Sequence, residues 1–244
     1  AVRDSSFRDY LQRKRVDLQA MELVSSDRRA TDLRKVRSVV ALRAYFKGPG
    51  AELVQRRKQA RRSRKVPTVY GGANSLFAMV EANPRWFKGI VGDLLSMWGK
   101  KSVSKPAQVR EIRDAANIFR AMLKTIPCGP VGSGRRGLLS LLDPIGVYFG
   151  HAAINAPFEP DPPCSFTVDT NTSEKVLSAL GMALNAGAIV YAPDEEDIGI
   201  LETVRGKRFR LSYVLAPHYF FKLVLGRSLS LSEIMKRESS TQDR

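Results

Sequence analysis

The chain has 244 residues and a formal net charge of +16, with 43% hydrophobic and 26% charged residues. This composition is that of an ordinary globular protein, with enough chain for one large domain or two small ones. No apolar run is long enough to cross a membrane and no signal peptide opens the sequence, which predicts a cytoplasmic location. The two cysteines, Cys128 and Cys164, have no metal-binding or redox spacing, which favours buried thiols in a reducing compartment.

The positive charge is concentrated in the N-terminal quarter of the chain. Residues 1–65 hold 19 Lys or Arg against 7 Asp or Glu, a net of +12, whereas the remaining residues hold 21 against 17. Such an asymmetry is typical of a protein with an anionic partner, most often nucleic acid.

Two amphipathic helices are predicted in the first 50 residues. The apolar face of the first consists of Phe7, Tyr10, Leu11, Leu18 and Met21. The second is expected over residues 33–46, with a cap at Thr31-Asp32 and an end at the glycine and proline that follow. Its apolar face is expected at Val36, Val40 and Leu42, and its polar face at Arg34, Lys35, Arg37 and Arg43.

A strongly basic run follows, in which seven of the ten residues at positions 56–65 are cationic and none is acidic. The cations are Arg56, Arg57, Lys58, Arg61, Arg62, Arg64 and Lys65. A solvated charge run, a contact with a phosphate backbone and a site for an acidic protein partner are three open interpretations. Because no aromatic residue is interleaved, base stacking is not indicated, and nucleic acid would be held by its backbone without sequence reading.

The central stretch, residues 70–98, predicts two helices joined by a tight corner. Their apolar faces are expected at Ala73, Leu76, Phe77 and Val80, and at Phe87, Ile90, Val91, Leu94 and Trp98. Asn83 is a good N-cap for the second helix, and Pro84 suits its first position. Arg85 then lies in the first turn, where a guanidinium beside free backbone N–H groups is well placed to meet a phosphate. The alternative is an ordinary surface arginine beside a well-capped helix.

The corner sequence EANPRW resembles the sensor-2 motif in the helical lid of AAA+ ATPases, which is usually Gly-Asn-Pro-Arg. The match covers Asn83, Pro84 and Arg85, while Ala82 stands where glycine is usual. The segment at residues 64–98, which contains this corner, resembles the lid of a bacterial group of ATPases similar to origin-recognition enzymes, and so does the late segment RFRLSYVLAPHYFF at residues 208–221. The resemblance implies that Arg85, placed by Asn83, senses ATP that a separate ATPase module holds, either upstream in the same polypeptide or on a partner chain.

The chain by itself is not expected to be an enzyme. The loop at residues 129–134 has the glycine spacing of a P-loop, but Arg135 and Arg136 replace the required Lys-Ser/Thr, and no other Walker A motif is present. The two histidines have no acidic or cysteine neighbours at ligand spacing, so no metal site is predicted. No cofactor is expected in this chain alone, and ATP with Mg²⁺ only in the complete protein.

A polar connector at residues 99–105 is predicted to separate two subdomains. The helix after it begins at Pro106 and is expected to bury Val109, Ile112, Ala116, Phe119 and Leu123. A short helix is then expected to end before Asp143-Pro144, with another segment around Tyr148. The prolines of residues 157–163 make that stretch irregular.

A helix over residues 173–186 followed by a β-hairpin indicates a winged-helix domain, and the resemblance to origin-recognition enzymes implies the same. The helix is predicted to begin with a capping box between Asn171 and Glu174 and to stop at Gly187. A strand is expected directly after this stop, at residues 188–191.

The hairpin of this domain is expected to pair residues 199–203 with residues 208–215. Its cations are Arg205, Lys207, Arg208 and Arg210. The preceding loop carries four acids at residues 194–197, which would repel a nearby phosphate. Because Lys175 is the only cation of the helix before the hairpin, backbone contacts by the wing, or protein binding, are favoured over base reading in the major groove.

Together these patterns predict a mainly α fold in two parts. Residues 1–104 form a basic helical region with an AAA+-type lid, and residues 105–244 form a winged-helix domain with a small β-hairpin wing. The predicted function is the regulatory, nucleic-acid-binding C-terminal part of an origin-recognition-like AAA+ ATPase, with non-specific contacts to DNA and no membrane partner. The alternative is a protein-interaction scaffold subunit whose basic helices dock on an acidic partner. Whether the full assembly is an oligomer stays open.

Overall fold

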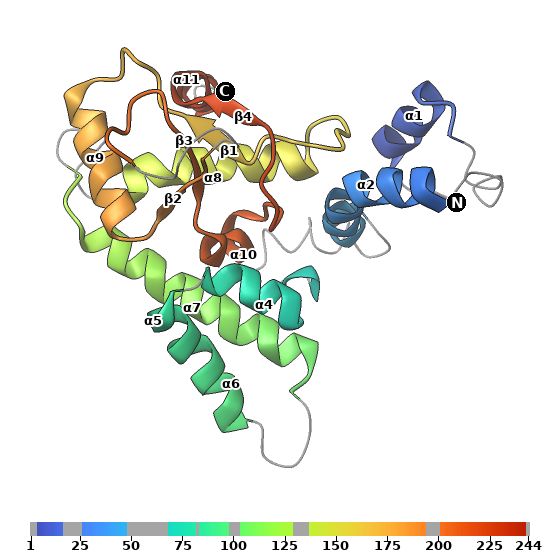
Figure 1. The fold of residues 1–244 in the computed structure, drawn as a ribbon, viewed down its shortest axis with the longest axis horizontal. Coiled ribbons are helices and arrows are strands. Elements are labelled where there is room, and N and C mark those ends of the chain that lie inside the picture. Colours follow the sequence, from blue (N-terminus) through green and yellow to red (C-terminus); the bar gives the residue numbers. More distant parts are fainter. Residues whose placement is uncertain are drawn as a thin grey trace.

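A computed structural model describes residues 4–16, 26–47, 68–81, 83–97, 103–128, 137–193 and 201–242. The helical elements are α1 (Ser5–Arg13), α2 (Ser26–Lys47), η2 (Thr68–Tyr70), α4 (Ala73–Val80), α5 (Pro84–Trp86), η3 (Phe87–Val91), α6 (Gly92–Met97), α7 (Lys105–Thr125), α8 (Leu139–Ile154), α9 (Glu174–Asn185), η5 (Tyr213–Leu215), α10 (Ala216–Tyr219) and α11 (Leu231–Gln242). The strands are β1 (Ser165–Thr167), β2 (Ile189–Tyr191), β3 (Arg208–Leu211) and β4 (Ser228–Ser230). The described part is therefore mainly helical with one small sheet, as predicted for the fold class (Figure 1).

The elements form three groups in Figure 1. Helices α4, α5, α6 and α7 lie together on one side of the molecule, and the sheet lies with α8, α9 and α11 on the other. Helices α1 and α2 lie at one end, where α2 packs against α8. One hydrophobic core runs through the helices and the sheet, from Leu42 in α2 to Ile234 in α11.

Helices α1 and α2 are joined to the C-terminal half of the chain by a buried arginine. Arg43 of α2 is 1% exposed and forms an ion pair of 2.5 Å with Asp4, the N-cap of α1. Its guanidinium also donates hydrogen bonds to the carbonyls of Ala153 and Ala156, at the C-terminal end of α8. The prediction that Arg43 lies on a polar outer face is therefore wrong. The Asp4 carboxylate and the carbonyls at the end of α8 accept the hydrogen bonds that water would accept from an exposed guanidinium.

Helix α2 is longer than the sequence predicts. It begins at Ser26, so the cap expected at Thr31-Asp32 is wrong. No glycine or proline interrupts the stretch before Thr31, and the helix extends through it. Among the side chains of residues 36–46, which the structure describes, Val39 and Leu42 are apolar and buried.

Helix α7 buries the stripe that the sequence predicts. Val109, Ile112, Ala116, Phe119 and Leu123 are all buried. Ser104 caps the helix, because its hydroxyl accepts a hydrogen bond from Ala107 N. The helix packs against η2, η3 and α6 and also against η5 and α10, so it connects the first helical group to the C-terminal half.

Helix α8 continues through Pro144, so the prediction of a helix that ends before Asp143-Pro144 is wrong. The proline removes one backbone hydrogen bond. Burial offsets this loss, because the buried side of α8 includes Leu139, Leu141, Leu142, Ile145, Phe149, Ala153 and Ile154. Gly146 and Gly150 allow a close approach to Tyr219. A Cβ atom at Gly150 would lie 1.9 Å from the Tyr219 carbonyl oxygen.

The sheet has the strand order β2-β3-β1-β4, with β1 antiparallel to β3 and parallel to β4. In register, Phe166 faces Phe209 and Ile189 faces Leu211, and all four side chains are buried. Helix α9 packs beside β2. The sheet therefore contributes its apolar residues to the same core as the helices.

The hairpin differs from the prediction in its first strand. Strand β3 pairs with β2, and residues 201–203 form no strand. The end of the second predicted strand is also wrong, because residues 213–215 form the 3-10 helix η5. Pairing with β2 sets Tyr191 beside Phe209 and Ile189 beside Leu211, so apolar side chains face each other across the two strands. Residues 201–203 offer fewer such partners, because only Leu201 among them is apolar.

Helix α9 stops where predicted but starts differently. Ser173 is the N-cap and makes no side-chain capping bond, so the capping box between Asn171 and Glu174 is wrong. The Glu174 carboxylate instead forms an ion pair with Arg205 at 2.5 Å. At the other end Gly187 has φ +71°. The N–H of Ala188 then donates a hydrogen bond of 2.8 Å to the carbonyl of Ala183, in the last turn of the helix.

Candidate nucleotide-sensing corner and nucleic-acid surface

The corner between α4 and α5 forms as the sequence predicts. Asn83 has an extended backbone, with φ −82° and ψ 112°, and its Oδ1 accepts a hydrogen bond from Arg85 N at 3.0 Å. Pro84 takes the first helical position, and Phe87 N donates to the Asn83 carbonyl over 2.9 Å. Asn83 therefore satisfies donors of the first turn and fixes the backbone from which Arg85 extends.

The Arg85 side chain is exposed, and no described residue forms an ion pair or a hydrogen bond with its guanidinium. It lies in the first turn of a helical run that continues through η3 into α6. A guanidinium beside the first peptide N–H groups of a helical run can meet an anionic oxygen without breaking an internal contact.

The π-helical turn η3 changes which residues face the core. Ile90 and Leu94 are buried as predicted, whereas Phe87 is 46% exposed. The wider turn moves Phe87 further from Ile90 around the axis, so its predicted place on the buried face is wrong. In α4 the prediction for Phe77 is also wrong, because that side chain is 64% exposed and Met79 is buried instead.

Glu81 lies two residues before Asn83 and ties the corner to the segment after β3, although no sequence pattern indicates this role. Its Oε1 accepts hydrogen bonds from Arg210 Nη1 and, over 2.9 Å, from Tyr213 N. Its Oε2 accepts one from Ser212 Oγ over 2.6 Å. The Arg210 guanidinium lies 3.9 Å from the centre of the Tyr213 ring. Burial raises the pKa of Tyr213 to about 12 against the opposing charge of Arg210, so the ring is neutral.

The cations predicted for the hairpin are half-buried. Arg210 pairs with Glu81, and Arg205 and Arg208 also have internal partners. Arg205 donates hydrogen bonds of 2.6 and 2.7 Å to two main-chain carbonyls of the turn before α9 and pairs with Glu174. Arg208 donates to the Gly226 carbonyl over 2.6 Å. Lys207 lies next to Arg208 at the start of β3. Arg205 and Arg208 therefore hold the loops around the sheet in place by hydrogen bonds. The binding of nucleic acid by Arg205, Lys207 and Arg208 stays a prediction.

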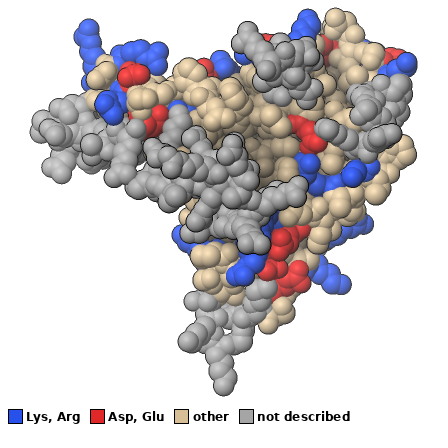
Figure 2. Space-filling model, turned by 180° about the vertical axis from the view of Figure 1, so that it is seen from behind, with Lys and Arg blue, Asp and Glu red and all other residues tan. Residues whose placement is uncertain are grey.

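The exposed cations near the N-terminus lie on α1, which is anchored to the rest of the chain, or in the turn directly after it. They are Arg8, Arg13, Lys14 and Arg15, and all four are exposed. Figure 2 shows basic side chains at the end of the molecule where α1 lies, with acidic ones beside them. Beneath them, the Phe7 and Tyr10 rings pack at 4.5 and 5.0 Å from the Phe158 ring, and Ser6 Oγ accepts a hydrogen bond from Phe158 N. The basic run at residues 56–65 lies outside the described residues, as do the four acids at residues 194–197.

A metal site or a membrane-spanning helix among the described residues would bear on function. In the part of the chain that the structure describes, no group of His, Cys, Asp and Glu side chains could hold a metal ion. None of the helices described combines the length and the apolar character that a membrane crossing needs. Both cysteines are free and buried, as predicted, and burial raises the pKa of Cys164 to about 12.

The fold and the corner define a mainly helical protein with an exposed arginine placed by an Asn-Pro cap. The chain matches the family model described as ORC-CDC6-like over residues 1–231 and belongs to this family. The match confirms the origin-recognition resemblance that the corner and the late segment indicate, and it suggests part of an origin-recognition-like AAA+ protein. No curated protein and no solved structure matches the chain significantly.

Proposed function

We propose that this chain is the regulatory, nucleic-acid-binding C-terminal part of an origin-recognition-like AAA+ ATPase. In this proposal Arg85 contacts nucleotide that a separate ATPase module holds together with Mg²⁺. The observation that carries the proposal is the corner itself, where Asn83 caps the helix start and the Arg85 guanidinium has no described partner. A cation held near the terminal phosphates stabilises the negative charge of the transferring phosphoryl group.

The C-terminal half is proposed to be a winged-helix domain. The order α8, β1, α9, β2, β3, with β3 paired between β2 and β1, supports this assignment because a helix leads directly into a hairpin of a small sheet. Helix α9 carries Lys175 as its only cation. Few charged groups on α9 could reach phosphates or base edges, so contacts to the phosphate backbone are expected to dominate over base reading.

Nucleic acid, with DNA as the expected form, is proposed to bind along the basic N-terminal region. Support comes from the net charge of +12 in residues 1–65 and from the exposed cations at the end of α1. The anchor between Arg43 and Asp4 supports it further, because a basic helix held in place loses less freedom when it binds than a solvated run does.

The first test is the substitution Arg85→Ala in the complete ATPase. ATP turnover is expected to fall at least about tenfold, because a cation that meets developing phosphoryl charge typically contributes that much or more. The matched control is Arg110→Ala, which removes an exposed arginine of α7. It should leave turnover unchanged. Wild-type turnover in Arg85→Ala would return Arg85 to the class of ordinary surface arginines.

The second candidate function is a protein-interaction scaffold that docks its basic helices on an acidic partner. The exposed apolar side chains of the helical group favour it, since large apolar groups in contact with water often mark protein interfaces. These side chains are Phe77, Phe87, Leu95, Ile118 and Met122. A chain that binds no nucleic acid at low salt would favour this candidate.

A further inference from the structure

Glu81 has a backbone conformation that side chains rarely adopt. At the C-terminal end of α4 its φ is +49° and its ψ is 38°, in the left-handed region. Glycine is the usual residue there, because a Cβ atom makes this conformation unfavourable. Non-glycine residues persist in it where surrounding contacts compensate, and such positions cluster at functional sites. The contacts that hold Glu81 are therefore informative.

Both carboxylate oxygens of Glu81 have partners, and these partners belong to one short segment. Arg210 and Tyr213 N contact one oxygen, and Ser212 Oγ contacts the other. The Glu81 and Arg210 side chains are only 10% and 15% exposed. Charged hydrogen bonds shielded from water are stronger than exposed ones, and an unpaired partner there is costly. The contact thus favours one position of Glu81 relative to β3.

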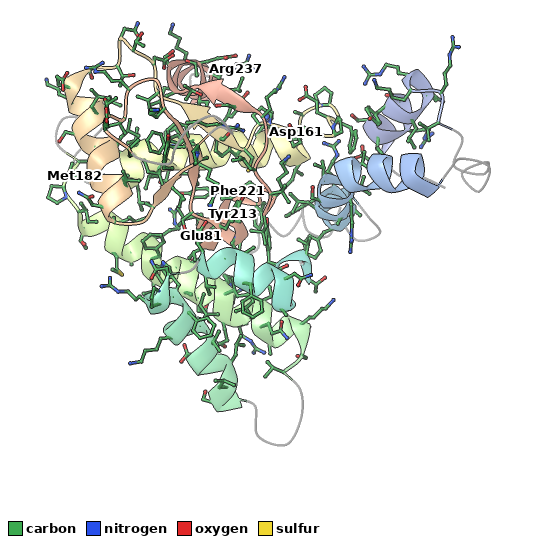
Figure 3. All side chains as sticks on the ribbon, viewed as in Figure 1. Glu81, Asp161, Met182, Tyr213, Phe221 and Arg237 are labelled. Carbon is green, nitrogen blue, oxygen red and sulfur yellow. The ribbon has the colours of Figure 1, made fainter. Side chains whose placement is uncertain are left out.

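The contact between Glu81 and residues 210–213 determines where the corner between α4 and α5 begins. Figure 3 shows Glu81 and Tyr213 close together, between α4 and the segment that follows β3. A single residue separates Glu81 from Asn83, whose cap then sets the first turn and Arg85. A shift of Glu81 would therefore be passed to Arg85 through only a few backbone bonds.

We propose that Glu81 is a positioning residue for Arg85: it holds the corner against β3 so that the guanidinium reaches the nucleotide in one geometry. This inference rests on the proposed function. In this role Glu81 does not contact the nucleotide itself, because both of its carboxylate oxygens already accept hydrogen bonds from internal donors. Glutamine at this position keeps the shape but loses the charge that Arg210 requires.

The test is a double-mutant cycle in the complete ATPase with Glu81→Gln, Arg85→Ala and the two combined. Glu81→Gln alone is expected to lower ATP turnover by about 10- to 100-fold, since a displacement of about 1 Å can cost about a factor of 100. In the Arg85→Ala background the same substitution should have almost no further effect, because the group that it positions is absent. A residue that only stabilises the fold would lower turnover by the same factor in both backgrounds.

The control is Glu233→Gln, which alters the exposed ion pair between Glu233 and Arg237 in α11 and should leave turnover unchanged. Circular dichroism of each variant checks that it folds. If Glu81→Gln does not fold, Arg210→Lys takes its place in the cycle, because lysine keeps the charge opposite Glu81. Equal factors in both backgrounds, or wild-type turnover in Glu81→Gln, would overturn the positioning role alone. Wild-type turnover in Arg85→Ala would overturn the proposed function as well.

Discussion

Asp169 shows how a single carboxylate connects the sheet to the last helix. Its Oδ1 accepts a hydrogen bond from Ser230 Oγ over 2.6 Å, and its Oδ2 accepts one from Ser232 N over 2.9 Å, at the start of α11. Partial burial raises the pKa of Asp169, but these hydrogen bonds outweigh burial and lower the pKa below its ordinary value. The ionised carboxylate therefore stabilises the native state.

The substitution Asp169→Asn is expected to make stability less dependent on pH. A carboxyl whose pKa is lowered on folding adds stability above its unfolded pKa of about 3.9, and this is lost as pH falls through the folded value. Urea unfolding should therefore show the variant about 1 kcal/mol less stable than the wild type at neutral pH. The difference should shrink as the pH falls through about 4 and below. A difference that stays constant over this range would contradict the argument.

At the residue scale, the sequence predicts contacts between neighbours but not contacts across the chain. The Asn83 cap is predictable because its partner, Arg85 N, is two residues away. The Glu81 contacts are not, because their partners lie 129 or more residues further along the chain. The buried position of Arg43 is not predictable for the same reason, because the carbonyls to which it donates hydrogen bonds lie more than 100 residues away.

Among the elements, α8 depends most on close packing. Its Gly150 lies against the backbone of α10, and its Asp143 accepts hydrogen bonds from Tyr219 OH and from Arg120 of α7. Burial raises the pKa of Tyr219, so the phenol stays protonated as a donor. The contact between α8 and α10 therefore has no room for an added side chain at Gly150.

Two glycine-to-alanine substitutions separate packing from helix propensity. Gly150→Ala is expected to lower the free energy of unfolding by about 1–3 kcal/mol, because its Cβ would meet the Tyr219 carbonyl at 1.9 Å. The matched variant Gly181→Ala lies in α9, and nothing lies within 4 Å of its Cβ position. It should raise the free energy of unfolding by about 0.5–1 kcal/mol. Urea denaturation measures both, and a Gly150→Ala variant as stable as the wild type would contradict the packing described.

Elements with a strong local pattern are predictable from the sequence, and those decided by tertiary contacts are not. The stripe of α7 and the Gly187 stop of α9 follow from apolar spacing and from the left-handed backbone of glycine. The helix through Pro144 does not, because burial of α8 outweighs the local preference of proline. The partner of β3 is likewise decided by apolar contact with β2.

At the scale of the whole molecule, exposed cations lie on α1 and in the turn after it, whereas the hairpin cations Arg205 and Arg208 have internal partners. The charge asymmetry is visible in the sequence, whereas the internal contacts of Arg205 and Arg208 depend on the fold. We therefore expect nucleic acid to contact the N-terminal region first. A variant with Arg13, Lys14 and Arg15 replaced by Ala removes the cations at the end of α1.

The most direct test of nucleic-acid binding through the N-terminal region is the salt dependence of DNA binding by this chain. Fluorescence anisotropy with labelled duplex DNA should show binding that weakens strongly between about 50 and 200 mM salt. Replacement of Arg13, Lys14 and Arg15 should make the log–log slope shallower by about 0.9 for each phosphate that the variant no longer neutralises. The control replaces three exposed cations of α7, Lys105, Arg110 and Lys124, and should keep the wild-type slope. Absence of binding at low salt, or equal slopes in the two variants, would contradict this role of the N-terminal cations.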